Sequence, residues 1–389
     1  MPTYRIFASN PTNFDLYGEI PFSTLDFSDV LNAAGNISIT VPLLDSTILP
    51  ASHVTPGSTA LWVERDGVLV WGGVLWTVDV DLIGQTINMS GEGWLSYYSH
   101  RILTSNFDTG QFSAGTAGAD VTLTMWYLLR VAHEEMPGIP AWGYPYPPRS
   151  NVPNIDTTAW IISALNGGVG WTPVGAVLAS DVTNIGTMIQ EVCSGTFATS
   201  ALDDVPIQTL DYWIEPVWDT ANNRPSCAWK FVNNRRGSAL AKPLSLTAGV
   251  LSLNVTYDAV KMANQVSVLG DGEGDMAPSG SASVVPTGLF LQTAFSRQLV
   301  NPVSCANFAQ DAVAALSKVH VIPQVSLLGE NPAWEYQSYN VGDTFVIGVS
   351  QGFIDLASTP WRITEKATSV DASGTEVVTL TVADSVLYE

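Results

Sequence analysis

The stretch LWVERDGVLVWGGVLW, residues 61–76, decides the local fold of the N-terminal third of the chain. Asp66-Gly67 separates two runs rich in Val, Leu and Trp, and an Asp-Gly pair in that setting is the strongest short-range signal for a β-hairpin. A strand with one solvated face alternates apolar and polar residues, but the second strand of this hairpin is apolar on both faces. Two sets fall on opposite faces of a regular strand: Leu69, Trp71 and Leu75, and Val68, Val70, Val74 and Trp76.

Two arrangements would cover the second apolar face of this hairpin. In the first, a neighbouring subunit packs on it, and Trp62, Trp71 and Trp76 are the candidate interface residues, because Trp is enriched in the cores of protein interfaces. In the second, the face is covered within the same chain, by a helix such as the one expected at 121–136. A polar group buried there without a partner would cost roughly 1–3 kcal/mol, so either arrangement explains why the face is apolar.

Composition and charge exclude several classes of function. Charged residues make up 13% of the 389 residues, about half the usual share. The net charge of −21 leaves no basic surface that could grip nucleic acid, and Arg235-Arg236, the only basic pair, is expected in a surface turn. An acidic wall would nevertheless suit a channel through which a duplex must slide.

Targeting and cysteine signals are weak. No apolar run approaches the ~18 residues that span a bilayer, and the N-terminus lacks the pattern of a signal peptide, so no membrane insertion is expected. Cys193, Cys227 and Cys305 are far apart and form no CxxC motif, so we expect neither a disulfide framework nor a zinc site. These features favour synthesis in a reducing cytosol.

Most of the chain has the pattern of short β-strands, with three predicted helices. Helical periodicity follows Asp120 over residues 121–136, a second helix begins at about Asp181, and a third begins at Asn301-Pro302, a cap followed by the residue best suited to the first helical position. Two stretches predict loops: the proline- and aromatic-rich residues 137–153, and the low-complexity residues 270–288.

A weak internal repeat links the two ends of the chain. PGSTALWV at 56–63 is similar to VGDTFVIG at 341–348, and each is followed by a Trp-bearing strand, a Gly turn and another alternating strand. The repeat has no short period, so it does not indicate a solenoid. It predicts two copies of one small β-domain, one near each end.

Several of these motifs together resemble a known family. NAAGNISITVPL (32–43), RDGVLVWGGVL (65–75) and GEGWLSYYSHRIL (91–103) resemble the N-terminal region of tail-tip hub proteins of long-tailed, non-contractile bacteriophages. YDAVKMANQVSVLGDGEG (257–274), YNVGDTFVI (339–347) and the stretch 361–382 are similar to the later part of the same proteins. The resemblance covers most of the chain in order.

The resemblance implies a mainly β fold with some α-helix, in which two tube-like β-barrel domains carry lateral α/β insert domains. The expected boundaries are 1–103 for the first barrel, 104–200 for a lateral mixed domain with helices, 201–262 and 325–389 for the second barrel, and 263–324 for an inserted loop and helix.

The resemblance also implies a structural virion protein at the tail tip, made in the host cytoplasm. Family members form homotrimers, so that two barrels in each of three chains match a sixfold tail tube above and threefold tip or fibre proteins below. The implied partners are other tail proteins: the distal tail protein, the tape measure and fibre or receptor-binding proteins. DNA would pass through the lumen without specific binding.

The sequence offers no clear catalytic or cofactor site, and we expect no enzyme, no cofactor and no bound metal. His133-Glu134-Glu135 lacks the second histidine of a zinc motif, and the acidic loop 270–275 is a weak calcium candidate. Two alternatives stay open: a cell-wall hydrolase that uses Glu134-Glu135 or Asp203-Asp204, and a carbohydrate-binding adhesin. The adhesin would use the aromatic residues Trp142, Tyr144 and Tyr146.

Overall fold

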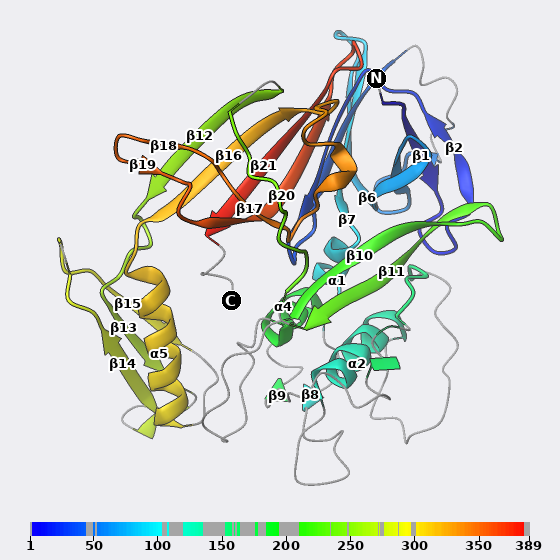
Figure 1. Cartoon of the computed structure of the whole chain (residues 1–389). Helices are drawn as coiled ribbons and strands as arrows, with labels where there is room; N and C mark the ends of the chain where they lie inside the picture. The colour runs from blue at the N-terminus through cyan, green and yellow to red at the C-terminus, as the bar shows by residue number, and fades with distance from the viewer. Residues whose placement is uncertain are drawn as a thin grey trace.

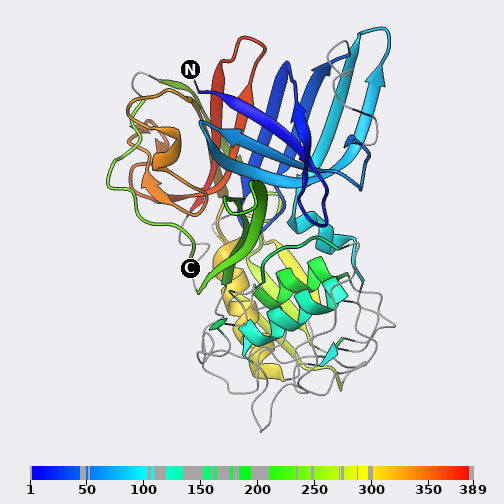
Figure 2. The same ribbon diagram turned by 90° about the vertical axis from the view of Figure 1, so that its right-hand side faces the viewer.

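The structure of the chain is a computed structural model, shown in Figure 1. It describes residues 2–43, 50, 53–102, 107–108, 120–134, 152–157, 159, 162–163, 176–177, 184–193, 210–233, 235–246, 249–270, 272, 276–286, 288–296 and 301–384. Figure 2 shows a large sheet in the upper half of the molecule, with the helices α2, α4 and α5 below it.

One antiparallel sheet of twelve strands dominates the fold, which confirms the prediction of a mainly β protein with a few helices. Its order is β12-β16-β21-β20-β3-β4-β7-β6-β5-β1-β2, and β17 pairs with the start of β20. The N-terminal β unit consists of β1 (Tyr4–Ser9), β2 (Leu16–Ile20), β3 (Thr24–Val30), β4 (Asn36–Pro42), β5 (Ala60–Arg65), β6 (Val68–Asp81) and β7 (Thr86–Gly93). The C-terminal β unit consists of β12 (Val250–Asp258), β16 (His320–Leu328), β17 (Thr344–Val346), β20 (Pro360–Val370) and β21 (Glu376–Asp384).

The two β units share one topology. The order β3-β4-β7-β6-β5 in the first corresponds to β12-β16-β21-β20-β17 in the second, and the strands follow the same sequence order in both. In each unit a positive-φ glycine donates a backbone hydrogen bond to the long strand: Gly57 N to Leu75 O at 2.7 Å, and Gly342 N to Ile363 O at 2.8 Å. The next residue of each long strand, Trp76 or Thr364, is the extra residue of a β-bulge. The internal repeat in the sequence is therefore a repeated fold.

Each β unit has its own hydrophobic core, on one face of the shared sheet. The N-terminal core includes Leu25, Phe27, Ile39, Val63, Trp71 and Leu75. The C-terminal core includes Val325, Leu327, Phe345, Ile363, Leu380 and Val382. Corresponding positions are filled by similar residues, because strands of the same topology present the same alternate positions to their core.

The hairpin predicted at Asp66-Gly67 is present, but its faces differ from the prediction. Asp66 and Gly67 take φ values of 51° and 83°, as a tight hairpin turn requires. Val63 pairs with Trp71 and Glu64 with Leu69, so Val70 is an extra residue that forms a bulge. Because a bulge reverses the alternation, Leu69 packs into a different core from Trp71 and Leu75, and the prediction of one shared face is wrong.

Gly72 lies where β6 approaches a tryptophan ring. A Cβ built on Gly72 would be 2.6 Å from the six-membered ring of Trp62, which is fully buried. We expect Gly72→Ala to lower the free energy of unfolding by about 1–3 kcal/mol, because the ring has no free space into which to move. Urea denaturation measures the change. Gly288→Ala, where a Cβ would meet no atom within 4 Å, is the control, and equal effects of the two substitutions would contradict the prediction.

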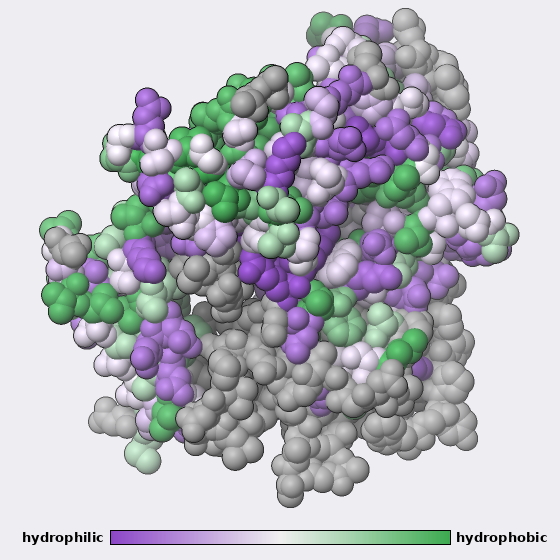
Figure 3. All heavy atoms as spheres, viewed as in Figure 1, coloured by the Kyte–Doolittle hydropathy of each residue, from purple (hydrophilic) through white to green (hydrophobic). Residues whose placement is uncertain are grey.

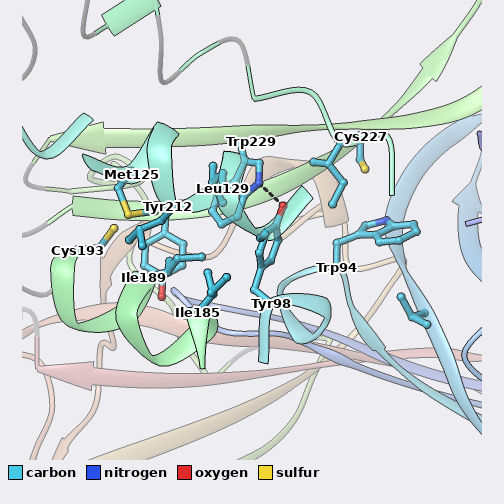
Figure 4. Packing of buried hydrophobic residues seen from close by; sticks show 14 of the residues in the cluster. Trp94, Tyr98, Met125, Leu129, Ile185, Ile189, Cys193, Tyr212, Cys227 and Trp229 are labelled. Atoms are coloured by element: carbon cyan, nitrogen blue, oxygen red, sulfur yellow. Dashed lines mark hydrogen bonds between the residues drawn. The ribbon is translucent and has the colours of Figure 1, made fainter. Parts of the chain in front are cut away.

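A lateral domain covers the other face of the β5–β6 hairpin. It contains α1 (Leu95–Ser99), α2 (Val121–Glu134), α4 (Ile185–Cys193) and the hairpin of β10 (Leu210–Asp219) and β11 (Arg224–Asn233), with the short strands β8 (Phe107–Asp108) and β9 (Ala176–Val177). Its core, the lateral core, includes Trp62, Leu69, Val74, Trp94, Tyr98 and Trp229 (Figure 4). The hairpin β10–β11 belongs to this core, whereas the resemblance implies that residues 201–262 belong to the second barrel.

The helices predicted over 121–136 and from about Asp181 correspond to α2 and α4. Met125, Leu128, Leu129 and Ala132 of α2 are all fully buried, and Asp120 Oδ1 accepts a hydrogen bond from Thr122 N at 2.8 Å. The helix expected from about Asp181 begins only at Ile185. Its cap is Asn184, whose Oδ1 accepts from Thr187 N at 2.7 Å, because a cap must lie within three residues of the amide that it satisfies. Asp181 lies outside the described residues.

A small domain is inserted between β12 and β16. It consists of β13 (Gln265–Leu269), β14 (Ser279–Ser283), β15 (Gln292–Ser296) and α5 (Pro302–Leu316), with Asn301 as the predicted cap of α5. The prediction of a loop over 270–288 is wrong for β14, which pairs with β13 although its residues are small and polar. The remaining short elements are β18 (Ser350–Gln351), β19 (Ile354–Asp355) and the 3-10 helix η6 (Tyr336–Ser338).

Candidate functional site

The joint between the two β units is a direct pairing of β3 with β20. Six residue pairs run from Glu365 opposite Val30 to Val370 opposite Leu25. On the core side of this joint the side chains are buried: Leu25, Phe27, Lys366, Thr368 and Val370 are each at most 6% exposed. Backbone pairing between β3 and β20 therefore joins the two β units into one continuous sheet. On the core side of the joint, the packed side chains exclude solvent.

Lys366 is a buried basic residue at the joint. Its Nζ donates hydrogen bonds to Tyr336 O at 2.7 Å and to Tyr339 O at 3.2 Å, and lies 3.5 Å from the centroid of the Tyr336 ring. Burial lowers the pKa of this ammonium group to about 7, although Asp29 and Glu376 oppose the shift. Lys366 thereby anchors the η6 segment against the joint.

A buried ion pair links the two β units a second time. Arg65, at the end of β5, donates from Nη2 to Glu376 Oε2 at 2.9 Å, and Glu376 begins β21 in the other unit. Both side chains are at most 10% exposed. The guanidinium carbon of Arg65 lies 4.4 Å from the centroid of the Tyr336 ring, so the ion pair and the Lys366 cluster share one aromatic partner.

Asp211 ties the lateral domain to both β units. Its Oδ2 accepts from the guanidinium of Arg362 on β20 and from the backbone N of Arg236, and its Oδ1 accepts from Asn32 Nδ2 at 2.9 Å. Asp211 and Arg362 are 3% and 1% exposed. Arg236 was expected in a surface turn; it instead contacts Asp29 at 2.9 Å and lies over the ring of Trp213.

The face of the sheet opposite the two cores has a hollow that crosses the joint. The hollow is lined by residues of β3, β4, β6, β7, β20 and β21, with no Lys or Arg among the described residues that line it. Its polar lining residues include Asp26, Asn36, Ser38, Ser90, Glu92, Glu365 and Thr379, and Trp76 and Val377 are among its apolar ones. The charged side chains that line the hollow are therefore all acidic.

The three candidate interface tryptophans differ in exposure. Trp62 is fully buried and donates from Nε1 to Ser9 Oγ at 2.8 Å, and Trp71 is 5% exposed in the N-terminal core. Both faces of the hairpin are covered within the chain, so Trp62 and Trp71 leave little surface for a second subunit. Trp76 is only partly buried; it donates to Ser96 Oγ at 3.1 Å and its ring lies 4.4 Å from that of His100.

Candidate catalytic residues form no cluster in the described part of the chain. His133 Nε2 is hydrogen-bonded to Tyr98 OH at 3.0 Å, and burial lowers its pKa to about 4, so it is a neutral core residue at physiological pH. Within the described ranges, no three His, Cys, Asp or Glu side chains could hold a metal ion. Several candidates lie outside these ranges: Glu135, Trp142, Tyr144, Tyr146, Asp203, Asp204, Asp271, Glu273 and Asp275.

The arrangement of two joined β units with lateral domains is the phage tail hub-like fold. The 43 kDa tail protein of prophage MuSo2 from Shewanella oneidensis superposes with a TM-score of 0.60 at 11% identity, over 99% of this chain and 100% of that chain. The tail protein from Neisseria meningitidis MC58 superposes with a TM-score of 0.58 at 8% identity, over 99% of this chain and 98% of that chain. No protein-family model and no curated protein matches the sequence.

No helix in the described ranges has both the length and the apolar character that crossing a bilayer requires.

Proposed function

We propose that this protein is a structural component of a bacteriophage tail, a trimeric hub at the tail tip that continues the tail tube. The observation that carries the proposal is the repeated β unit: two copies of one topology are joined edge to edge in a single sheet. The fold shared over nearly the whole chain with two phage tail proteins supports the tail role.

The repeat gives the proposed hub its symmetry. If the joint between neighbouring chains repeats the β3–β20 joint within a chain, each unit meets the next in the same way and the assembly closes into a ring. When each joint turns the chain by one sixth of a circle, three chains supply six similar units. Such a ring presents six units to a sixfold tube and three lateral domains to threefold tip or fibre proteins.

The acidic side chains of the hollow support the proposal that the ring encloses a channel for DNA. Its lining carries Asp26, Glu92 and Glu365 and no described Lys or Arg, so it offers no cation to hold a phosphate. With a net charge of −21, the protein repels a duplex and lets it slide. The distal tail protein, the tape measure and fibre or receptor-binding proteins are the proposed neighbours in the virion.

The state of assembly tests this function. We expect native mass measurement of the purified protein to give three times the chain mass of 41.6 kDa, and electron microscopy to show rings with a central channel. Turbidity of a host cell-wall preparation should stay constant, since a structural hub does not hydrolyse it. A monomer at high concentration, also found singly in the virion, would contradict the proposal.

A further inference from the structure

Two edges that stay open among the described strands correspond, by their place in the repeated topology, to the two strands of the internal joint. Within the described residues, β12 pairs only with β16 and so ends the sheet. In the N-terminal unit, residues 77–81 of β6 pair with β7 on one side, and no described strand lies on the other, since β5 pairs only with residues 68–74. In the repeated topology, β12 corresponds to β3, and the end of β6 corresponds to the end of β20. β3 and β20 are the two strands that form the joint.

We propose that β12 of one chain pairs with residues 77–82 of a second copy, the end of β6 and the residue that follows it, in the register that the β3–β20 joint sets. This inference rests on the proposed function and specifies its interface. The strand register within each β unit shows which residue of the N-terminal unit corresponds to which residue of the C-terminal unit. The bulges align Trp76 with Thr364, so Thr77 corresponds to Glu365, and the pairing with the central strands aligns Leu25 with Leu253.

Transferring the six pairs of the joint gives the register between copies. Asp79 lies opposite Thr256, and Val80 lies opposite Val255 of the second copy. The full set of pairs is Thr77 with Asp258, Val78 with Tyr257, Asp79 with Thr256, Val80 with Val255, Asp81 with Asn254, and Leu82 with Leu253. In this register no two like charges lie opposite each other. The register was taken from the internal joint alone, without regard to charge, so this agreement supports it.

Side-chain chemistry supports this register independently of topology. The positions on the core side of the internal joint carry apolar side chains at the open edges. These are Val78, Val80 and Leu82 on one edge, and Leu253, Val255 and Tyr257 on the other. Val80, Leu82 and Tyr257 are 51%, 70% and 44% exposed, so pairing would bury apolar surface that the single chain leaves in water. Figure 3 shows hydrophobic residues gathered over the β12 edge. An exposed apolar edge strand is a site of strand addition.

Disulfide trapping tests the register. Directly opposed residues of antiparallel strands have Cα atoms about 4.5–5.5 Å apart, within disulfide range, whereas diagonal neighbours are about 7–8 Å apart. Under mild oxidation, Asp79→Cys/Thr256→Cys should give covalent trimers on non-reducing denaturing gels. Asp79→Cys/Asn254→Cys, the same strands shifted by two residues, is the matched control and should stay monomeric. Cys193, Cys227 and Cys305 are buried and leave the background low.

Native mass measurement of the same cysteine variants distinguishes a failure of this inference from a failure of the proposed function. Trimers in which the first pair does not link, or in which the shifted pair links better, would overturn the register and leave the hub intact. Monomers throughout would overturn both. As a second variant, Val80→Asp should weaken trimers by more than about tenfold, because it buries an unpaired charge. Val285→Asp, at a residue 92% exposed away from both edges, should leave assembly unchanged.

Discussion

Asp211→Ala is expected to lower the free energy of unfolding by about 3–5 kcal/mol, the largest effect of any single substitution considered for this chain. The carboxylate is the counter-ion of Arg362, which is 1% exposed on β20, and the substitution leaves that guanidinium buried without a negative partner. It also leaves the amide hydrogens of Asn32 and the backbone N of Arg236 without their acceptor. Urea denaturation followed by tryptophan fluorescence measures the loss.

A double-mutant cycle distinguishes the loss of the ion pair from the loss of side-chain packing at position 211. In the Arg362→Met background, Asp211→Ala should have a much smaller effect, because no buried charge is left unpaired. Asp219→Ala, at an acid on the same hairpin whose ion pair with Arg224 is partly exposed, is the matched control and should have a much smaller effect than Asp211→Ala. Equal effects of Asp211→Ala in both backgrounds would refute the assignment.

Lys366 is expected to make stability rise with pH above neutrality. Its pKa falls to about 7 in the folded protein against 10.5 for an ordinary lysine, so between these values the unfolded chain binds more protons than the folded one. Folding is then favoured progressively as pH rises from about 7 to about 10, by up to about 1.4 kcal/mol per pH unit. Below pH 7 both states are protonated and this slope disappears.

The difference between the wild type and Lys366→Met isolates this group from the others that titrate in the same range. Between pH 7.5 and 9.5, the wild type should gain about 2 kcal/mol on the variant, as measured by urea denaturation in the presence of a reductant. Lys230→Met, at a lysine whose side chain is 44% exposed, is the matched control. A difference between the wild type and Lys366→Met that stays constant from pH 7.5 to 9.5 would contradict the prediction.

Local signals predicted the elements of this fold well. Asp66-Gly67 predicted its hairpin because positive φ at two successive residues leaves few other turns, and Asn301-Pro302 predicted the start of α5 for an equally local reason. Prediction failed where a single extra residue mattered: Val70 reverses the alternation of β6, and no periodicity in one strand shows that its partner has one residue fewer.

The candidate site was harder to predict than the elements. Trp62, Trp71 and Trp76 were selected because both faces of their hairpin are apolar, yet two of them are buried within the chain by the lateral domain and the N-terminal core. No sequence pattern indicates that Lys366 of the joint and Asp211 of the lateral domain are buried, because an isolated charge in a strand is usually solvated. Only their partners, far away in sequence, make them part of a buried junction.

Local sequence patterns were enough to predict that the chain is mainly β, where the β5–β6 hairpin and the helices form, and that one β unit occurs twice. These properties depend on periodicity, turn conformation and capping, all of which act over a few residues. Contacts between segments distant in sequence set the pairing of β3 with β20 and the packing of the hairpin β10–β11 in the lateral core, and they leave open the edges seen among the described strands. The physical reason is that backbone hydrogen bonds at a strand edge are the same for any partner, so the choice among partners is made by packing across the whole chain.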